Sequence, residues 1–273
     1  MPVCRLPGLE LYFVERGQGE PLIFLNGLAG DSMSWMGQLK TFSRHYRCLA
    51  LDNRDVGQSS YVNAAYTTRD LGQDLVGFCE QLRLGPAHVV GVSMGGMIAQ
   101  EMALAAPDRV ASLVLVNTLA AADDWFRATL DLFKLIRQQG PDTAAFFSRL
   151  LPWWVSHEFF QDSGRTSWLM WLLSQNPYAQ KLDGFMRQLE AVAAHTTSAR
   201  LGSIRCPVLI LSGVDDHIMP PRFALELKKL IPHAVLQQVP GVGHALPVEN
   251  PVLFNSSLTQ FLNSLAVPRK QSA

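Results

Sequence analysis

The chain has 273 residues, of which 48% are hydrophobic, and its 23 basic and 23 acidic residues leave a formal net charge of zero at pH 7. A neutral chain without a basic stripe is not expected to bind nucleic acid or an anionic membrane. The N-terminal residues include no apolar signal segment, and no apolar run is long enough to span a bilayer, so we expect a cytoplasmic protein. The length suits one large domain with an insertion.

Neither a metal nor an organic cofactor is expected. The four cysteines are widely spaced without a C-x-x-C pattern, which is typical of free thiols. Five histidines have no carboxylate or second histidine at metal-ligand spacing: His45, His88, His157, His195 and His233. The glycine-rich segments match neither a Walker nor a dinucleotide pattern, so no nucleotide is implied.

Strand and helix patterns alternate through the first part of the chain. Apolar residues alternate from Leu9 to Phe13 as in an edge strand, and residues 22–25 and 46–51 are expected to form further strands, the latter buried. Between Thr67 and Leu84 the apolar positions recur at helical spacing, and Gly-Pro follows directly. Such alternation predicts a mostly parallel sheet covered by helices on both faces.

The most specific motif is a serine in a tight turn. Residues 91–96 read Gly-Val-Ser-Met-Gly-Gly, after the apolar run 87–90 and before a helix-like stretch that continues to residue 106. A turn that pushes Ser93 outward needs small residues two places to either side, and glycine occupies both. Unpaired amides at the start of the helix would stabilise negative charge on a bound carbonyl oxygen. This context predicts that Ser93 is a nucleophile.

The segment from about residue 119 to 201 interrupts the alternation, because it follows the strand pattern at 113–116 with helix patterns alone. It holds five of the chain's six tryptophans and seven phenylalanines: Trp125, Trp153, Trp154, Trp168, Trp171, Phe126, Phe133, Phe146, Phe147, Phe159, Phe160 and Phe185.

A serine nucleophile needs a base, and the base needs an orienting acid. The apolar strand 206–211 is followed by a loop with Asp215 and Asp216, and the strand-like run 234–239 is followed by His244 between glycine and alanine. These loops supply the missing groups. The closing segment, 247–265, is predicted to be one helix.

These residues resemble the α/β-hydrolase superfamily, in its serine esterase and enol-lactonase-like branch, over nearly the whole chain. The matching pieces are residues 91–96, the Gly-x-x-Asp-x-x-x-Pro loop at 213–220, Gly-His at 243–244 with Glu-Asn-Pro at 249–251, and the loop 52–59. The serine, acid and histidine also follow one another in that family's order. The resemblance implies an α/β fold with a mostly parallel sheet flanked by helices. The core would comprise residues 1–118 and 202–273, and residues 119–201 would form a helical cap.

The resemblance implies the site residues. Ser93, Asp216 and His244 would form the catalytic triad, and the backbone amides of Leu28 and Met94 would form the oxyanion hole. The spacing from the flanking glycine and proline selects Asp216 over its neighbour Asp215, although some relatives take the acid from an earlier loop, here near Asp123 and Asp124.

The substrate pocket is expected between the core and the cap. So many aromatic rings exceed what a few short helices bury, so some should line a cleft for an apolar substrate. We expect Trp153 and Trp154 in its wall. Asn26 stands where many relatives have histidine, and we expect its amide to order the pocket loop rather than to act in catalysis.

The loop 52–59 departs from the family pattern at Asp55, which stands in place of glycine. Aspartate tolerates a positive φ better than most residues, so the turn is expected to survive with a local side-chain bond. We interpret this loop as structural, with contact of Arg54 or Asp55 with substrate as the alternative.

The prediction is a serine hydrolase that cleaves carboxylic esters of small to medium apolar substrates through an acyl-enzyme, without a cofactor. Three alternatives stay open: a lactone or enol-lactone hydrolase, a carbon–carbon hydrolase of ring-cleavage products, and a ligand receptor with vestigial hydrolase activity. The sequence predicts neither the acyl preference nor the oligomeric state.

Overall fold

The computed structural model describes residues 2–140 and 143–265. Within them, eight strands form one sheet in the order β1-β2-β4-β3-β5-β6-β7-β8. β2 pairs antiparallel with both β1 and β4, and all further pairs, from β4–β3 to β7–β8, are parallel. The strands are β1 (Val3–Leu6), β2 (Leu9–Arg16), β3 (Glu20–Leu25), β4 (Tyr46–Leu51), β5 (Ala87–Val92), β6 (Val110–Val116), β7 (Val208–Gly213) and β8 (Val235–Val239). The predicted mostly parallel sheet is confirmed.

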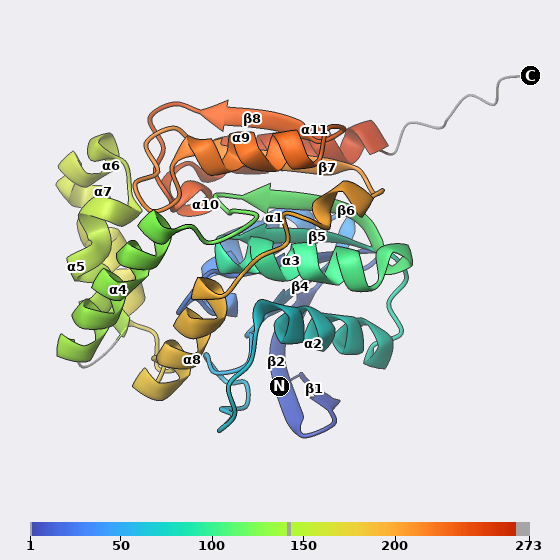
Figure 1. Ribbon diagram of the computed structural model, residues 1–273, viewed down its shortest axis with the longest axis horizontal. Helices are drawn as coiled ribbons and strands as arrows, with labels where there is room; N and C mark the ends of the chain where they lie inside the picture. Colours follow the sequence, from blue (N-terminus) through green and yellow to red (C-terminus); the bar gives the residue numbers. More distant parts are fainter. Residues whose placement is uncertain (1, 141–142, 266–273) are drawn as a thin grey trace, which may run out of the picture.

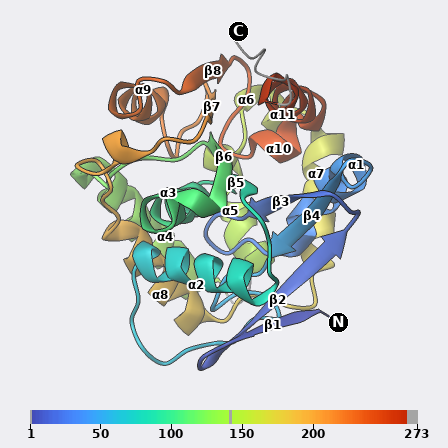
Figure 2. The same ribbon diagram turned by 90° about the vertical axis from the view of Figure 1, so that its right-hand side faces the viewer.

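Helices cover both faces of this sheet, as Figure 2 shows. One face carries α2, α3 and α9, and the other carries α1 and α11. Their bounds are α1 (Met36–Phe42), α2 (Thr68–Gln81), α3 (Met94–Ala105), α9 (Pro221–Leu230) and α11 (Pro251–Leu265).

The central strands consist mostly of apolar residues because both of their faces are buried. In β3, Ile23 and Leu25 pack in one core with α2 and α3, whereas Leu22 and Phe24 pack in the other with α1 and α11. Successive side chains of a strand point to opposite faces, so one continuous apolar run serves two cores.

Two sequence predictions were wrong, one on the position of a strand in the sheet and one on the extent of a helix. The expected edge strand at Leu9 is internal to the sheet, because β1 pairs with it along its outer side. The single closing helix is divided into α10 (Leu246–Glu249) and α11, with a non-helical Asn250 between them. Pro251 explains the division, because proline lacks an N–H and disfavours helical geometry in the residue before it.

Between β6 and β7 the described chain forms α4 (Asp124–Gln139), α5 (Thr143–Trp154), α6 (His157–Gln161), α7 (Ser163–Ser174) and α8 (Leu182–Ala193), hereafter the insertion helices. Figure 1 shows them gathered beyond the arrowheads of the parallel strands, at the carboxyl end of the sheet. Ligands of open parallel sheets bind at this end. No helix of the described residues has the length and apolar character to span a membrane.

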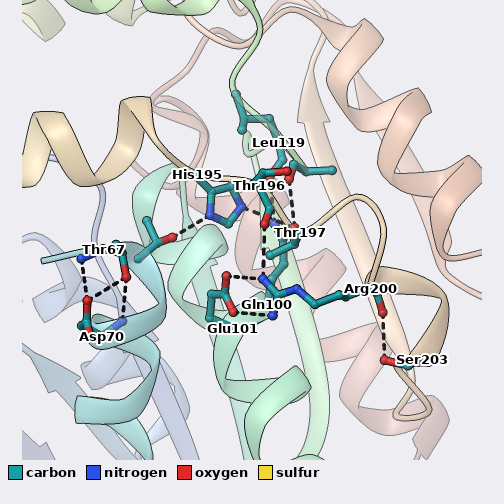
Figure 3. Close-up of polar contacts among 12 residues, drawn as sticks. Thr67, Asp70, Gln100, Glu101, Leu119, His195, Thr196, Thr197, Arg200 and Ser203 are labelled. Carbon is teal, nitrogen blue, oxygen red and sulfur yellow. Dashed lines mark hydrogen bonds and ion pairs between the residues drawn. The ribbon is translucent and has the colours of Figure 1, made fainter.

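The chain enters the insertion near Leu119 and leaves it near Thr197. These two segments, hereafter the entry and exit crossings, lie side by side (Figure 3). Ala121 and Thr196 form an isolated antiparallel bridge. Gln100 of α3 donates to the Leu119 carbonyl at 3.0 Å and accepts from the Thr197 hydroxyl at 2.6 Å. Both crossings are therefore fastened to the helix that begins directly after Ser93.

Candidate active site

Ser93 occupies a strained turn between β5 and α3. Its φ of 56° and ψ of −121° are rare for a residue with a side chain. A Cβ on Gly91 would lie 2.2 Å from the Gly95 carbonyl oxygen, and a Cβ on Gly95 would lie 2.4 Å from the Leu25 carbonyl oxygen. Both glycines are thus required by close backbone approach, as the sequence pattern predicted.

Neighbouring strand ends hold the Ser93 backbone. Its N–H donates to the Val116 carbonyl at 2.9 Å, and its carbonyl accepts from the Thr118 hydroxyl at 2.8 Å. The side chain is half-buried and faces the loop after β3, since a Cβ on Gly27 would lie 3.4 Å from Ser93 Oγ.

That loop, residues 26–31, is hereafter the Asn26 loop. The Asn26 amide donates to the Asp31 carbonyl, and the Gly30 N–H donates to the Gly27 carbonyl at 3.1 Å. Ala29 lies between these bonds with a φ of 64°. The Asn26 side chain thus bonds to its own loop, which is the ordering arrangement that we expected.

The two expected oxyanion residues come from the Asn26 loop and from the residue directly after Ser93. Leu28 belongs to the Asn26 loop and is half-buried, whereas the Met94 side chain is fully buried at the start of α3. Their assignment as oxyanion donors concerns backbone amides and stays a prediction.

A buried carboxyl group closes the Asn26 loop. Burial raises the pKa of Asp31 to about 6, and repulsion from Asp52 adds to this effect. Its Oδ2 accepts from the amide of Asn176 at 2.5 Å, and its Oδ1 accepts from the Met33 N–H at 3.0 Å. The loop is therefore joined to the insertion segment between α7 and α8.

Asp216 and His244 form a buried pair at 2.7 Å, between Oδ2 and Nδ1. The other carboxylate oxygen, Oδ1, accepts from the Ile218 and Met219 amides at 2.8 and 2.7 Å. These bonds fix the carboxylate in the turn after β7. His244 comes from the loop after the neighbouring strand, β8, so the two side chains meet at the same edge of the sheet. A carboxylate on Nδ1 leaves Nε2 as the atom able to accept a proton.

The other candidate acids have different partners. Asp215 donates its backbone N–H to the Val242 carbonyl, whereas the carboxylate in contact with His244 is that of Asp216. Asp123 pairs with Arg222 at 2.5 Å and caps α4. Asp124 is exposed and pairs with Arg127. The spacing argument thus selected the aspartate that contacts the histidine.

Sequence analysis assigned no site role to Asn117, which organises the strand ends around the site. Its φ is 44°, and its side-chain amide donates to the Gly243 and His244 carbonyls at 3.0 and 2.8 Å. Its Oδ1 accepts from the Gly213 N–H at 2.8 Å. Asn117 therefore joins β6, β7 and the loop between β8 and α10 that carries His244 (residues 240–245, hereafter the histidine loop). A polar residue directly after a buried strand was the available signal.

Glu249 was seen in the sequence only as part of a family motif. Its carboxylate accepts from the Gly243 N–H at 3.0 Å and from the Ser156 N–H at 2.8 Å, and burial raises its pKa. The Ala245 N–H also donates to the Trp154 carbonyl at 3.0 Å. The histidine loop is thus bonded to the segment between α5 and α6.

The insertion aromatics fall into two groups. All of its phenylalanines except Phe160 are buried, and several stack edge to face around Phe146. Trp153 is exposed, as are three further tryptophans, whereas Trp154 is half-buried and packs on Phe147 with ring centroids 4.5 Å apart. Trp153 is thus largely solvent-exposed and Trp154 is partly buried, and their expected place in a pocket wall stays a prediction.

The loop 52–59 is held by ion pairs. Arg54 makes two bonds to Asp74, and Asp55 has a φ of 68°. Asp55 accepts from the Val62 N–H at 2.8 Å and from Arg187 of α8 at 2.7 and 3.0 Å. The expected local side-chain bond is therefore accompanied by a bond to the insertion. No group of three or more His, Cys, Asp or Glu able to hold a metal ion occurs among the described residues.

The parallel sheet, the serine turn after β5 and the histidine loop after β8 define an enzyme fold of the α/β-hydrolase class. A family model described as alpha/beta hydrolase fold matches residues 20–251, and the chain belongs to this family.

Known proteins show the same relationship along nearly the full length. The chain is 30% identical over 267 residues to a Mycobacterium tuberculosis protein named as a non-heme bromoperoxidase, BpoC, covering 94% of this chain and 99% of that protein. It is 26% identical over 269 residues to an Azorhizobium caulinodans protein named as a carbamate hydrolase, RutD, covering 97% and 99%. The enol-lactonase structure from Burkholderia xenovorans superposes with a TM-score of 0.87 at 23% identity, covering 96% and 100%, which shows a shared fold.

Proposed function

We propose that this chain is a serine hydrolase of carboxylic esters, with Ser93 as nucleophile, His244 as base and Asp216 as the orienting acid. The observation that carries the proposal is the buried 2.7 Å contact between Asp216 Oδ2 and His244 Nδ1. Two adjoining residues connect the serine and the histidine: the Val116 carbonyl accepts from the Ser93 amide, and Asn117 donates to the His244 carbonyl.

The reaction proceeds in two halves. His244 takes the proton of the Ser93 hydroxyl while Ser93 Oγ bonds to the ester carbonyl carbon. The oxyanion accepts hydrogen bonds from the Leu28 and Met94 amides. The carbon–oxygen bond to the leaving group then breaks, and the departing alcohol takes the proton from His244. A water molecule, deprotonated by His244, then attacks the acyl carbon. The bond from this carbon to Ser93 Oγ breaks, the carboxylic acid leaves, and Oγ takes the proton back from His244.

An apolar acyl group of small to medium size suits the surroundings of the histidine. Trp154 contacts the histidine loop through its carbonyl, and its ring packs on Phe147. Apolar surface of this kind favours carbon chains over charged groups through the hydrophobic effect.

The nucleophile is tested by substitution and labelling. Ser93→Ala should lower the turnover of p-nitrophenyl butyrate at least about a thousandfold, the scale on which triad members act. An organophosphonate p-nitrophenyl ester should bond through phosphorus to Ser93 Oγ with release of p-nitrophenolate, which mass spectrometry locates. The exposed Ser203 provides the control, since Ser203→Ala should be labelled like the wild type. An adduct elsewhere, or a Ser93→Ala variant with a tenth of the activity, contradicts the proposal.

The bond cleaved is tested by a substrate panel, because the relatives are named for different reactions. Aryl esters, methyl esters, lactones, a carbamate and a ring-cleavage diene are ranked by kcat/KM on the same preparation. We expect the esters to rank first. A single slow burst without turnover would instead indicate a ligand receptor.

A further inference from the structure

We propose that Gln188 of α8 is a positioning residue for the oxyanion hole, acting from the insertion through the Asn26 loop. This inference rests on the proposed function, in which the Leu28 amide is one oxyanion donor. Gln188 does not contact the reacting atoms and acts through the backbone of Ala29.

The Gln188 side chain joins three segments of the chain. It is fully buried, at 0% exposure. Its Oε1 accepts from the Ala29 N–H at 3.4 Å and from the Gln180 amide at 2.9 Å. Its Nε2 donates to the Arg54 carbonyl at 2.8 Å. A buried amide with all of these bonds fixes its partners, because losing it leaves buried polar groups unpaired.

The bond to Ala29 acts on the peptide plane next to the one that carries the Leu28 N–H. The Ala29 N–H and the Leu28 carbonyl belong to one plane, so holding this N–H restricts the ψ rotation of Leu28 and thereby the angle between the two planes. Ala29 has a φ of 64°, which a residue with a Cβ keeps only when its surroundings impose it. The bond from the Gly30 N–H to the Gly27 carbonyl closes the turn from the other side.

The helix that carries Gln188 packs closely against the core. A Cβ on Gly184 would lie 2.7 Å from the Asp55 carbonyl oxygen, so α8 approaches the loop 52–59 as closely as backbone contact allows. One turn along, Arg187 bonds to both carboxylate oxygens of Asp55, which is fully buried. The helix that carries Gln188 is therefore held in place against the core, and so is the side-chain amide that contacts the Asn26 loop.

The experiment compares Gln188→Met, which removes the amide at similar volume, with the wild type. We expect kcat for p-nitrophenyl butyrate to fall about tenfold to a hundredfold, while KM changes less than about threefold. The fall should not exceed the one caused by removing an oxyanion donor outright, which is about a hundredfold to a thousandfold. Affinity for an alkyl boronic acid, whose tetrahedral adduct needs the same donors, should fall by the same factor. Hydrogen exchange of residues 26–31 should accelerate, whereas that of residues 243–249 should not.

Gln38→Met is the matched control. Gln38 is a buried glutamine of α1 whose amide donates to the Pro247 carbonyl at 3.4 Å, so its removal also costs a buried bond. Equal effects of both variants on kcat, an effect of Gln188→Met on KM alone, or unchanged exchange at 26–31 would overturn the inference. If the wild type neither turns over esters nor is labelled at Ser93, the proposed function fails, and the exchange measurement still decides whether Gln188 holds the loop.

Discussion

Asp216 uses both carboxylate oxygens in defined contacts. Oδ1 is occupied by the Ile218 and Met219 amides, and Oδ2 is directed at His244. Two backbone amides keep the carboxylate from rotating, so the imidazole meets one orientation of its partner. An acid placed in this way selects the Nδ1–H tautomer and stabilises the positive charge that develops on the ring.

Asp216→Asn should remove most activity while the protein stays folded. The amide can keep one acceptor oxygen on the turn but would present an NH₂ group to Nδ1, which favours the wrong tautomer, and we expect a loss in kcat of about a thousandfold or more. Steady-state kinetics with an aryl ester measures it. Asp215→Asn, one residue away, should change kcat by less than about threefold on the scale of ordinary surface substitutions. A reversal of the two effects would show that the acid has been misassigned.

At the scale of elements, α8 explains the departure of this chain from its family at Asp55. Where a glycine would meet the positive φ without strain, this chain keeps a fully buried carboxylate paired with Arg187. The neighbouring carboxylate raises the pKa of the Arg187 guanidinium, and Asp183 adds to this shift. The residue with the strained backbone, Asp55, is thus also the residue that binds α8 to the loop 52–59.

Restoring the family residue with Asp55→Gly should destabilise the protein. Relief of the left-handed conformation gains about 1–2 kcal/mol, whereas breaking a buried ion pair from one side costs about 3–5 kcal/mol. We expect the free energy of unfolding in urea to fall by about 2 kcal/mol as the balance of these terms. Asp183→Asn, which removes the exposed partner of Arg187, should cost less than about 1 kcal/mol.

A double-variant cycle separates the pair from the turn. Combining Asp55→Gly with Arg187→Met should cost less than the sum of the single changes, because each single change already removes the same ion pair. An Asp55→Gly variant more stable than the wild type would show that strain exceeds the value of the pair.

At the scale of the whole molecule, the insertion and the core meet at a buried histidine. His195 lies at the exit crossing, where its Nδ1 contacts the Thr68 hydroxyl at 2.8 Å and its Nε2 contacts the Thr197 hydroxyl at 3.4 Å (Figure 3). Burial lowers the pKa of His195 to about 3, and the nearby Arg200 adds to the effect. The ring therefore stays neutral in the folded protein at pH values where an unfolded histidine is charged.

This pKa predicts acid sensitivity of the folded state. The unfolded chain binds a proton on His195 below about pH 6.5 and the folded chain does not, so the free energy of unfolding falls as pH drops from 6.5 toward 3. Between pH 6.5 and 5 this group should remove about 1.5 kcal/mol. In urea titrations at both pH values, His195→Asn should lose correspondingly less stability on acidification than the wild type. His217→Asn, at an exposed position, should retain the wild-type dependence, and equal dependence in all three proteins would refute the assignment.

The sequence by itself determined the fold class and the local geometry. The turn at Ser93 follows from two glycines that cannot carry a Cβ, and the strands follow from apolar periodicity, both of which are properties of neighbouring residues. The choice of Asp216 over Asp215 also rested on local spacing, and in the structure it is Asp216 that contacts His244.

Only the tertiary structure decided what holds these local pieces in register. Gln188 reaches Ala29 across 159 residues, and Glu249 reaches Ser156 across 93. The order of the edge strands and the partner of Asp55 are likewise long-range facts. Buried polar groups must find partners wherever the packed chain supplies them, and no periodicity or short motif encodes which distant residue that will be.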